Sequence, residues 1–119
     1  MLYALLCYAS EEEWKSRDRP QRARIMEAHI EEANLANANG KLVTSMRLLR
    51  TDAATTIRRT ESGIAVVDGP FAETREQLGG LHVLDCDHLD EAIAYARMYV
   101  AHGGTVEIRP LHPEPMSLD

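Results

Sequence analysis

The stretch MLYALLCY, residues 1–8, decides the fold of this chain, because it is an unbroken run of aliphatic and aromatic residues. Such a run predicts a strand buried on both faces, since a half-exposed strand would alternate apolar and polar residues. Successive side chains of a strand point to opposite faces. One face would carry Leu2, Ala4 and Leu6, and the other Tyr3, Leu5 and Cys7. The rest of the fold must therefore cover this strand from two sides.

Two helices and three further core strands are expected after this strand. Residues 21–38 show helical periodicity, and Gly40 would end that helix. Asp87 would cap a second, alanine-rich helix. The apolar stripes of the two helices are Ile25, Met26, His29, Ala33 and Ala36, and Leu89, Ala92, Ile93, Ala96 and Val100. The expected strands cover residues 41–49, 80–86 and 105–109.

Without residues 51–79, the elements follow the order β-α-β-β-α-β of a ferredoxin-like α+β sheet. Residues 1–119 are thus predicted to form one domain, in which the insert 51–79 holds a β-hairpin and its loop. Residues 110–119 contain three prolines and are expected to form an extended tail. Both helices of such a fold cover one face of the sheet. A second subunit is the simplest cover for the other face, so we expect a homodimer.

Composition narrows the class of protein. With 13 basic and 19 acidic residues the formal charge is -6, which argues against a nucleic-acid partner. The basic cluster at residues 14–24 is interrupted by Asp18 and Pro20 and is interpreted as the solvated start of a helix. No segment predicts a signal peptide or a membrane span, and the five histidines show no metal-ligand spacing. We expect a cytoplasmic protein with Cys7 and Cys86 reduced, no membrane contact and no metal or other cofactor.

The segment VVDGPFAETREQLGG, residues 66–80, resembles the hallmark of the DGPF subgroup of the YCII-related proteins, with Arg75 where lysine is usual. The resemblance extends over nearly the whole chain, including NANGKLV at 37–43, DHLDEAIAYA at 87–96 and GGTVEIRP at 103–110. It implies a dimeric α+β fold, ferredoxin-like or barrel-like. Genes of the DGPF subgroup often neighbour extracytoplasmic-function sigma factors, which suggests a regulatory role.

The wider YCII-like group pairs a helix histidine with an aspartate in a pocket. His29 matches that histidine, because it lies eleven residues before Gly40. The second expected strand, 41–49, lacks an acid, so Asp68 is the candidate that would orient His29 as a general base. Two plainer interpretations stay open. His29 would be a hydrogen-bonded core histidine, and Asp68 would accept backbone N–H groups in a turn.

Five further residues are candidates for substrate binding: Phe71, Glu73, Arg75, Glu76 and His82. Arg75 would bind a carboxylate beside an acid/base glutamate, or these charges would form an exposed ion-paired surface. Phe71 would anchor its loop in the core or dimer seam, or line a ligand pocket. His82 would face the dimer interface or the cavity of His29. Thr74 and Gln77 predict a capping box that starts a short helix.

Two functions are compatible with these residues. The first is a small-molecule enzyme with His-Asp acid/base chemistry, of proton-transfer or lyase type, acting on a small anionic or ring-bearing ligand. The second is a non-catalytic ligand-binding or regulatory module, whose insert serves dimerisation or partner docking. The environment of His29 discriminates between them, since a ring fully enclosed without a cavity would not act as a base.

Overall fold

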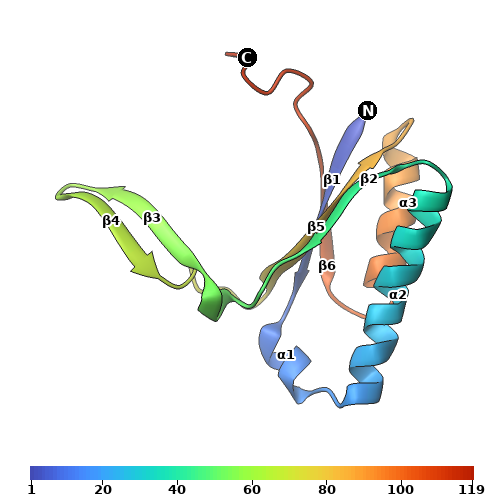
Figure 1. The fold of residues 1–119 in the computed structure, drawn as a ribbon, viewed down its shortest axis with the longest axis horizontal. Helices are drawn as coiled ribbons and strands as arrows, with labels where there is room; N and C mark the ends of the chain where they lie inside the picture. The colour runs from blue at the N-terminus through green and yellow to red at the C-terminus, as the bar shows by residue number, and fades with distance from the viewer.

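The computed structural model describes the whole chain, residues 1–119 (Figure 1). Its core is one antiparallel sheet in the order β2-β5-β1-β6, and a separate two-stranded ribbon is formed by β3 and β4. The elements are β1 (Leu2–Ala9), α1 (Glu11–Ser16), α2 (Arg19–Ala38), β2 (Leu42–Arg47), a 3₁₀ turn (Thr51–Ala53), β3 (Thr55–Thr60), β4 (Gly63–Asp68), β5 (Gln77–Asp85), α3 (Leu89–Val100) and β6 (Thr105–Pro110). The predicted α+β class is confirmed, and the strand order is consistent with a ferredoxin-like sheet.

The apolar first strand lies in the interior of the sheet, as its composition requires. Leu5 of β1 stands opposite His82 of β5 on one side and Ile108 of β6 on the other. Helices α2 and α3 lie together on one face of the sheet (Figure 1). The buried cluster between them consists of Tyr3, Leu5, Ala36, Leu84, Cys86, Ala92, Tyr95, Ala96 and Tyr99.

The buried face of α3 differs from the predicted stripe. Leu89 and Val100 are 48% and 40% exposed, whereas Tyr95 and Tyr99 are buried. The helix is rotated toward its tyrosines because a tyrosine ring buries more apolar area than a leucine or valine side chain. Its N-cap is His88, whose side chain accepts from the Glu91 backbone N–H. The prediction of Asp87 as the cap was wrong by one residue.

Two local predictions near the insert were also wrong. No helix follows Thr74, because Gln77 already belongs to β5 and pairs with Ala9 of β1. The Gln77 side chain does bond back to the Thr74 carbonyl, but it closes a turn rather than a helix. Conversely, α1 was not predicted. The Ser10 side chain caps it by accepting from the Glu13 backbone N–H, and an acidic first turn supports it.

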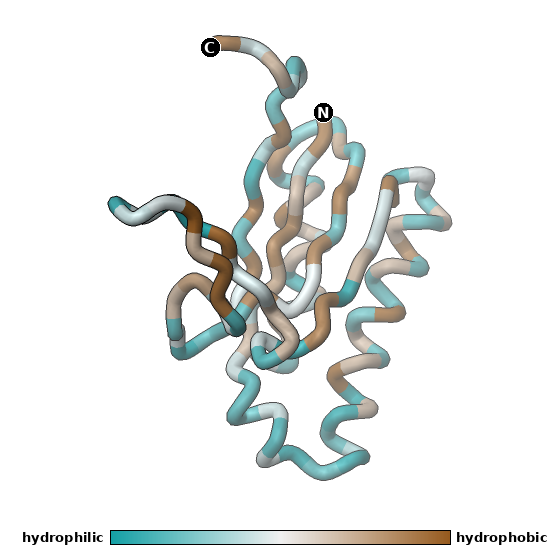
Figure 2. The backbone as a smooth tube through the Cα atoms, turned by 60° about the vertical axis from the view of Figure 1, so that its left-hand side comes forward, coloured by the Kyte–Doolittle hydropathy of each residue, from teal (hydrophilic) through white to brown (hydrophobic).

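The β3–β4 ribbon, residues 55–68, projects from the body of the protein and is called the hairpin arm (Figure 1). Figure 2 shows apolar segments along the arm as well as in the central strands. The chain after β6 runs away from the sheet at the opposite side of the body from α1 (Figure 1). Because the arm and this tail both run away from the body, and both long helices lie on one face of the sheet, the other face has no helix over it.

The glycine pair at the start of β5 gives a test of the sheet geometry. A Cβ atom at Gly80 would lie 2.8 Å from the Met46 carbonyl oxygen, whereas one at Gly79 would lie 3.9 Å from the Cys7 carbonyl oxygen. We expect Gly80→Ala to lower the free energy of unfolding by about 1–3 kcal/mol. Gly79→Ala should change it by less than about 1 kcal/mol. Urea unfolding measures both, and equal losses would contradict the close strand approach.

Candidate functional site

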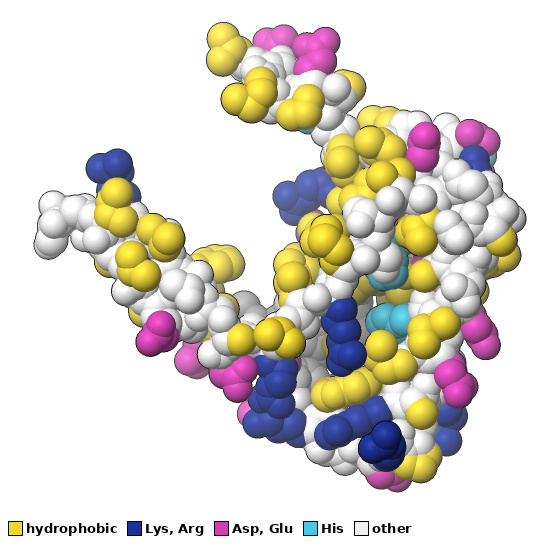
Figure 3. Space-filling model, viewed as in Figure 1, with side chains coloured by type: hydrophobic (Ala, Val, Ile, Leu, Met, Phe, Trp, Pro, Cys, Tyr) yellow, Lys and Arg dark blue, Asp and Glu magenta, His cyan; other side chains and the backbone are white.

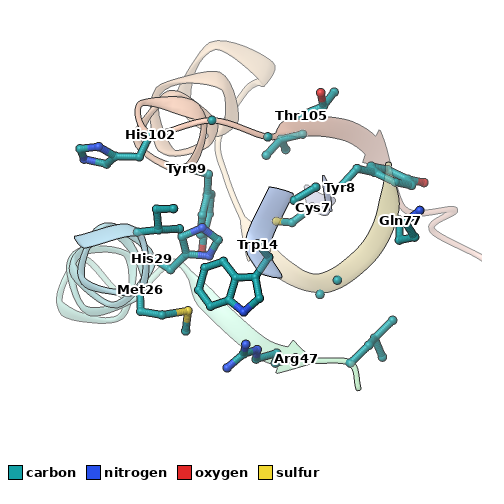
Figure 4. Close-up of a pocket in the computed structure, with 18 of the residues that line it drawn as sticks. Cys7, Tyr8, Trp14, Met26, His29, Arg47, Gln77, Tyr99, His102 and Thr105 are labelled. Carbon is teal, nitrogen blue, oxygen red and sulfur yellow. The ribbon is translucent and has the colours of Figure 1, made fainter. Parts of the chain in front are cut away.

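A cavity of about 450 Å³ lies on the helix side of the sheet, next to α1. Residues of β1, α1, α2, β2, β5, α3 and β6 line it. Figure 3 shows histidine and basic side chains gathered beside the helices, where the surface is hollowed. In the close-up, Trp14, His29, Arg47 and Tyr99 surround the hollow from four different elements (Figure 4).

Three buried polar side chains form a network at this cavity. The Tyr99 hydroxyl donates a hydrogen bond to Oε2 of Glu32, and it lies 2.7 Å from the ring nitrogens of His82. Glu32, Tyr99 and His82 are 0%, 2% and 7% exposed. Tyr99 and His82 line the cavity, and Glu32 lies behind them. The second carboxyl oxygen of Glu32, Oε1, has no hydrogen-bond partner.

Burial sets the protonation of this network. It raises the pKa of Glu32 to about 7, because a buried carboxylate loses its hydration. Burial, aided by the nearby His29, lowers the pKa of His82 to about 4. The pKa of Tyr99 is raised by burial and by its bond to Glu32. Near neutral pH, His82 is therefore uncharged and Tyr99 keeps its proton. The Glu32 carboxyl group is protonated in part of the molecules.

His29 lies on the open side of the network. Its ring meets the Tyr99 ring edge-on, with centroids 4.7 Å apart and an angle of 78° between the planes. The side chain is half-buried and lines the cavity, so it is not enclosed in a dry core. Burial and the charge of Arg47 lower its pKa, which favours the neutral imidazole that can accept a proton.

The cavity is basic although the chain is acidic. Four arginines line it, against a single acid, Glu11, whose carboxylate accepts hydrogen bonds from Thr51. The four arginines are Arg17, Arg22, Arg47 and Arg50. Because Arg47 and Arg50 have no ion-pair partner, the cavity is suited to an anionic ligand.

Trp14 supplies the apolar surface of this basic wall. The guanidinium carbons of Arg22 and Arg47 lie 5.5 Å and 5.9 Å from its ring centroid, within cation–π range. Arg22 Nε also donates to the Trp14 carbonyl oxygen, which fixes α1 against α2. The interpretation of residues 14–24 as a solvated helix start thus missed that Trp14, Arg17 and Arg22 turn toward the cavity.

The structure brings together only part of the site predicted from the sequence. His29 and His82 line the cavity. Asp68 ends β4 on the hairpin arm and does not line it. The other candidates, Phe71, Glu73, Arg75 and Glu76, are exposed and also lie outside its lining. Phe71 is 78% exposed, and Glu76 accepts a hydrogen bond from Thr105 at 3.1 Å.

Glu32 was missed by the sequence reasoning, although a signal for it exists. At 100° per residue, Glu32 falls between Ala28 and Ala36 on the helix surface. Both alanines are buried in α2, and so is Glu32. A charged residue inside an apolar stripe is an unusual feature, because burial of an acid costs free energy unless it is paired. Tyr99, which supplies that pairing, is 67 residues away and gives no local signal.

Neither nucleophilic thiol chemistry nor a protein-bound metal ion is indicated at the cavity. Burial and the charge of Glu32 raise the pKa of Cys7 to about 12, so its thiol stays protonated and is a poor nucleophile. No group of three or more histidine, cysteine, aspartate or glutamate side chains in residues 1–119 is placed to hold a metal ion. None of the helices combines the length and the apolar composition needed to cross a bilayer.

Comparison with known proteins gives the family of the chain. The YCII-related domain matches residues 1–114. An uncharacterized protein of Rhizobium meliloti (strain 1021) is 40% identical over 114 residues, which cover 93% of this chain and 92% of that protein. The family match at residues 1–114 covers the sheet, both long helices and every residue of the cavity. The chain therefore belongs to the family of YCII-related domains.

Proposed function

We propose that the protein is a small-molecule enzyme that moves a proton on an anionic ligand held in the cavity. The observation that carries the proposal is the Tyr99 hydroxyl, which joins buried Glu32 to cavity-lining His82. A buried acid with a pKa of about 7, coupled to a hydroxyl at a cavity wall, is a form of acid/base centre. His29, uncharged near neutral pH, supplies the base.

Each of these side chains has a separate role in the proposed reaction. Arg47 binds the anionic group of the ligand, and a flat part of the ligand lies against Trp14. His29 accepts a proton from a carbon next to a carbonyl group, and Tyr99 donates its hydroxyl proton to the carbonyl oxygen. Protonated Glu32 then returns a proton to Tyr99. In an isomerisation, protonated His29 then delivers its proton to another carbon of the ligand, and the enol hydroxyl returns its proton through Tyr99 to Glu32. With a leaving group on the ligand, protonated His29 gives its proton to the departing group instead, which is lyase chemistry.

In this proposal the carboxyl group of the centre is Glu32, which acts through Tyr99, whereas the sequence suggested Asp68 as a direct partner that orients His29. His29 and His82 keep their places as candidate site residues. The ligand class also stays the same, a small anionic or ring-bearing molecule, but its charge is bound by the arginines of the cavity rather than by Arg75.

A second candidate is a ligand-binding module without catalysis. It is favoured by one observation: His29 meets the Tyr99 ring edge-on, and the histidine that lies near a carboxylate is His82, so no carboxylate orients His29 as a base. The same cavity would then bind an anion for sensing or regulation. The two candidates differ in whether the bound ligand exchanges protons.

Deuterium incorporation tests the proposal. Small 2-oxo dicarboxylic acids in D₂O serve as probes, and proton NMR follows exchange at the carbon next to the carbonyl. We expect the wild type to accelerate exchange, and His29→Asn to lose this acceleration by about a hundredfold or more while still binding the probe. His102→Asn, which changes another histidine at the cavity, is the control and should keep the activity. Binding without exchange in the wild type would favour the module instead.

The quaternary arrangement completes the proposal. Leu6, Leu81 and Val83 point to the sheet face opposite the helices and are only half-buried. A homodimer in which the second chain covers this face, in a ferredoxin-like and barrel-like arrangement, would remove this apolar surface from water.

A further inference from the structure

The hairpin arm carries an apolar face that nothing in the chain covers. Ile57 pairs with Val66, and Ile64 pairs with Arg59, so the three aliphatic side chains share one face of the ribbon. Ile57, Ile64 and Val66 are 68%, 65% and 68% exposed. A two-stranded ribbon is marginally stable in water unless its apolar face packs on something else. The arm therefore requires a partner surface.

The size of the exposed surface indicates how large that partner contact is. The chain exposes 8690 Å², whereas a compact monomer of its mass, 13.3 kDa, exposes about 6,450 Å². Its radius of gyration is 16.4 Å, against about 13.5 Å for a compact domain of this length. Part of this excess of about 2,200 Å² comes from the extended tail after β6, and its size is within the range that one chain buries in an obligate homodimer.

The base of the arm is held firmly, so the arm is presented in a defined direction. Gly69 N donates to the Ala54 carbonyl and the Gly69 carbonyl accepts from Thr56 Oγ1, both at 2.7 Å. Arg58 donates to the Phe71 carbonyl at 2.8 Å. Gly69 has a φ of 103°, a conformation that L side chains rarely adopt. Residues 68–71 thus act as the structural base of the arm.

We infer that the arm is a dimerisation clasp, whose Ile57, Ile64 and Val66 face packs on the open sheet face of a second copy. The arm and that sheet face are the two uncovered apolar surfaces of the same chain. They cannot meet within one chain, because the arm diverges from the body and leaves open space between the two (Figures 1 and 3). In a dimer with a twofold axis, the arm of each chain would pack on the open sheet face of the other chain. Both apolar surfaces of both chains would then be covered. The inference rests on the proposed homodimer and adds the arm to its interface.

Neighbouring valines provide a matched pair for the test. Val66 lies on the aliphatic face of the arm, and Val67, 50% exposed, lies on the opposite face. We expect Val66→Glu to weaken dimerisation by about a hundredfold, since each dimer carries the charge twice and each copy costs about tenfold. Val67→Glu should leave the dimer constant within about threefold. Sedimentation velocity over a concentration series measures both constants.

Crosslinking with an apolar probe at position 66, which adds no charge to the interface, keeps the test valid if Val66→Glu fails to fold. A photoreactive phenylalanine replaces Val66, and chains labelled with ¹⁴N and ¹⁵N are mixed before irradiation. We expect mixed-label crosslinks from position 66 to peptides of β1 or β5. Two results would overturn the clasp but not the homodimer. The first is a dimer whose crosslinks from position 66 all lie within one chain. The second is a dimer that is weakened by Val67→Glu and not by Val66→Glu. A wild type that stays monomeric would overturn both.

Discussion

Replacing Glu32 by glutamine is expected to remove about 3 kcal/mol of pH dependence from the stability of the protein. The carboxyl group is fully buried and has a pKa of about 7, raised from 4.5. A raised pKa means that the folded state binds its proton more tightly than the unfolded state. The free energy of unfolding should therefore fall as the pH rises from about 4.5 to about 7, and then level off. Glutamine does not titrate and should show no such fall.

Urea unfolding between about pH 4.5 and about pH 8 gives the free energy of unfolding of the wild type and of Glu32→Gln. The difference between the two values at each pH measures this effect. The difference isolates Glu32, because His82, whose lowered pKa penalises the folded state in acid, is present in both proteins. Glu31→Gln is the matched control, since Glu31 is the exposed neighbour on the same helix. A constant difference between wild type and Glu32→Gln across this range would show that Glu32 is ionised normally in the fold.

Removing the Tyr99 hydroxyl is expected to have a comparable and equally pH-dependent effect. Tyr99→Phe deletes the only hydrogen bond that Glu32 accepts and leaves its carboxyl group buried without a partner. The loss of unfolding free energy should be about 3 kcal/mol near pH 8 and about 1 kcal/mol near pH 4.5, where the carboxyl group is uncharged. Thermal or urea unfolding at the two pH values measures it.

Tyr95→Phe provides the comparison, because the Tyr95 hydroxyl also bonds across elements, accepting from Asn39 at 2.9 Å. That bond is between uncharged groups, so its loss should cost about 1 kcal/mol at any pH. In the double variant of Glu32→Gln and Tyr99→Phe, the combined loss should be less than the sum of the single losses. Additive losses, or a Tyr99→Phe effect that matches Tyr95→Phe at both pH values, would contradict the coupled network.

The fold was predictable to the extent that local periodicity specified it. The apolar run 1–8 gave an interior strand, and the helix at 21–38 was placed within two residues of α2. The short helix α1 was missed because one turn with a single apolar residue, Trp14, has no period to detect. Its cap at Ser10 and the acidic residues that follow were the available signal.

Of the site residues predicted from the sequence, only the histidines His29 and His82 line the cavity. The insert predicted a site because charged and turn residues are dense in its sequence, yet Gly69 and Phe71 form hydrogen bonds at the base of the arm. The network joins residues that are far apart in sequence, since Glu32 and Tyr99 belong to different helices and His82 to a strand between them in the chain. No single segment carries that pattern. Only the position of Glu32 within an apolar stripe marked it as unusual.

The most direct test of the acid/base centre is a titration of its groups by NMR, with ¹³C-labelled glutamate and ¹⁵N-labelled histidine in the wild type. We expect the Glu32 carboxyl carbon to titrate with a midpoint near 7, and His82 to remain neutral until the pH falls toward about 4. Tyr99→Phe should shift the Glu32 midpoint further upward, because the hydroxyl stabilises the carboxylate. A Glu32 midpoint near 4.5, unchanged by Tyr99→Phe, would contradict the proposed centre.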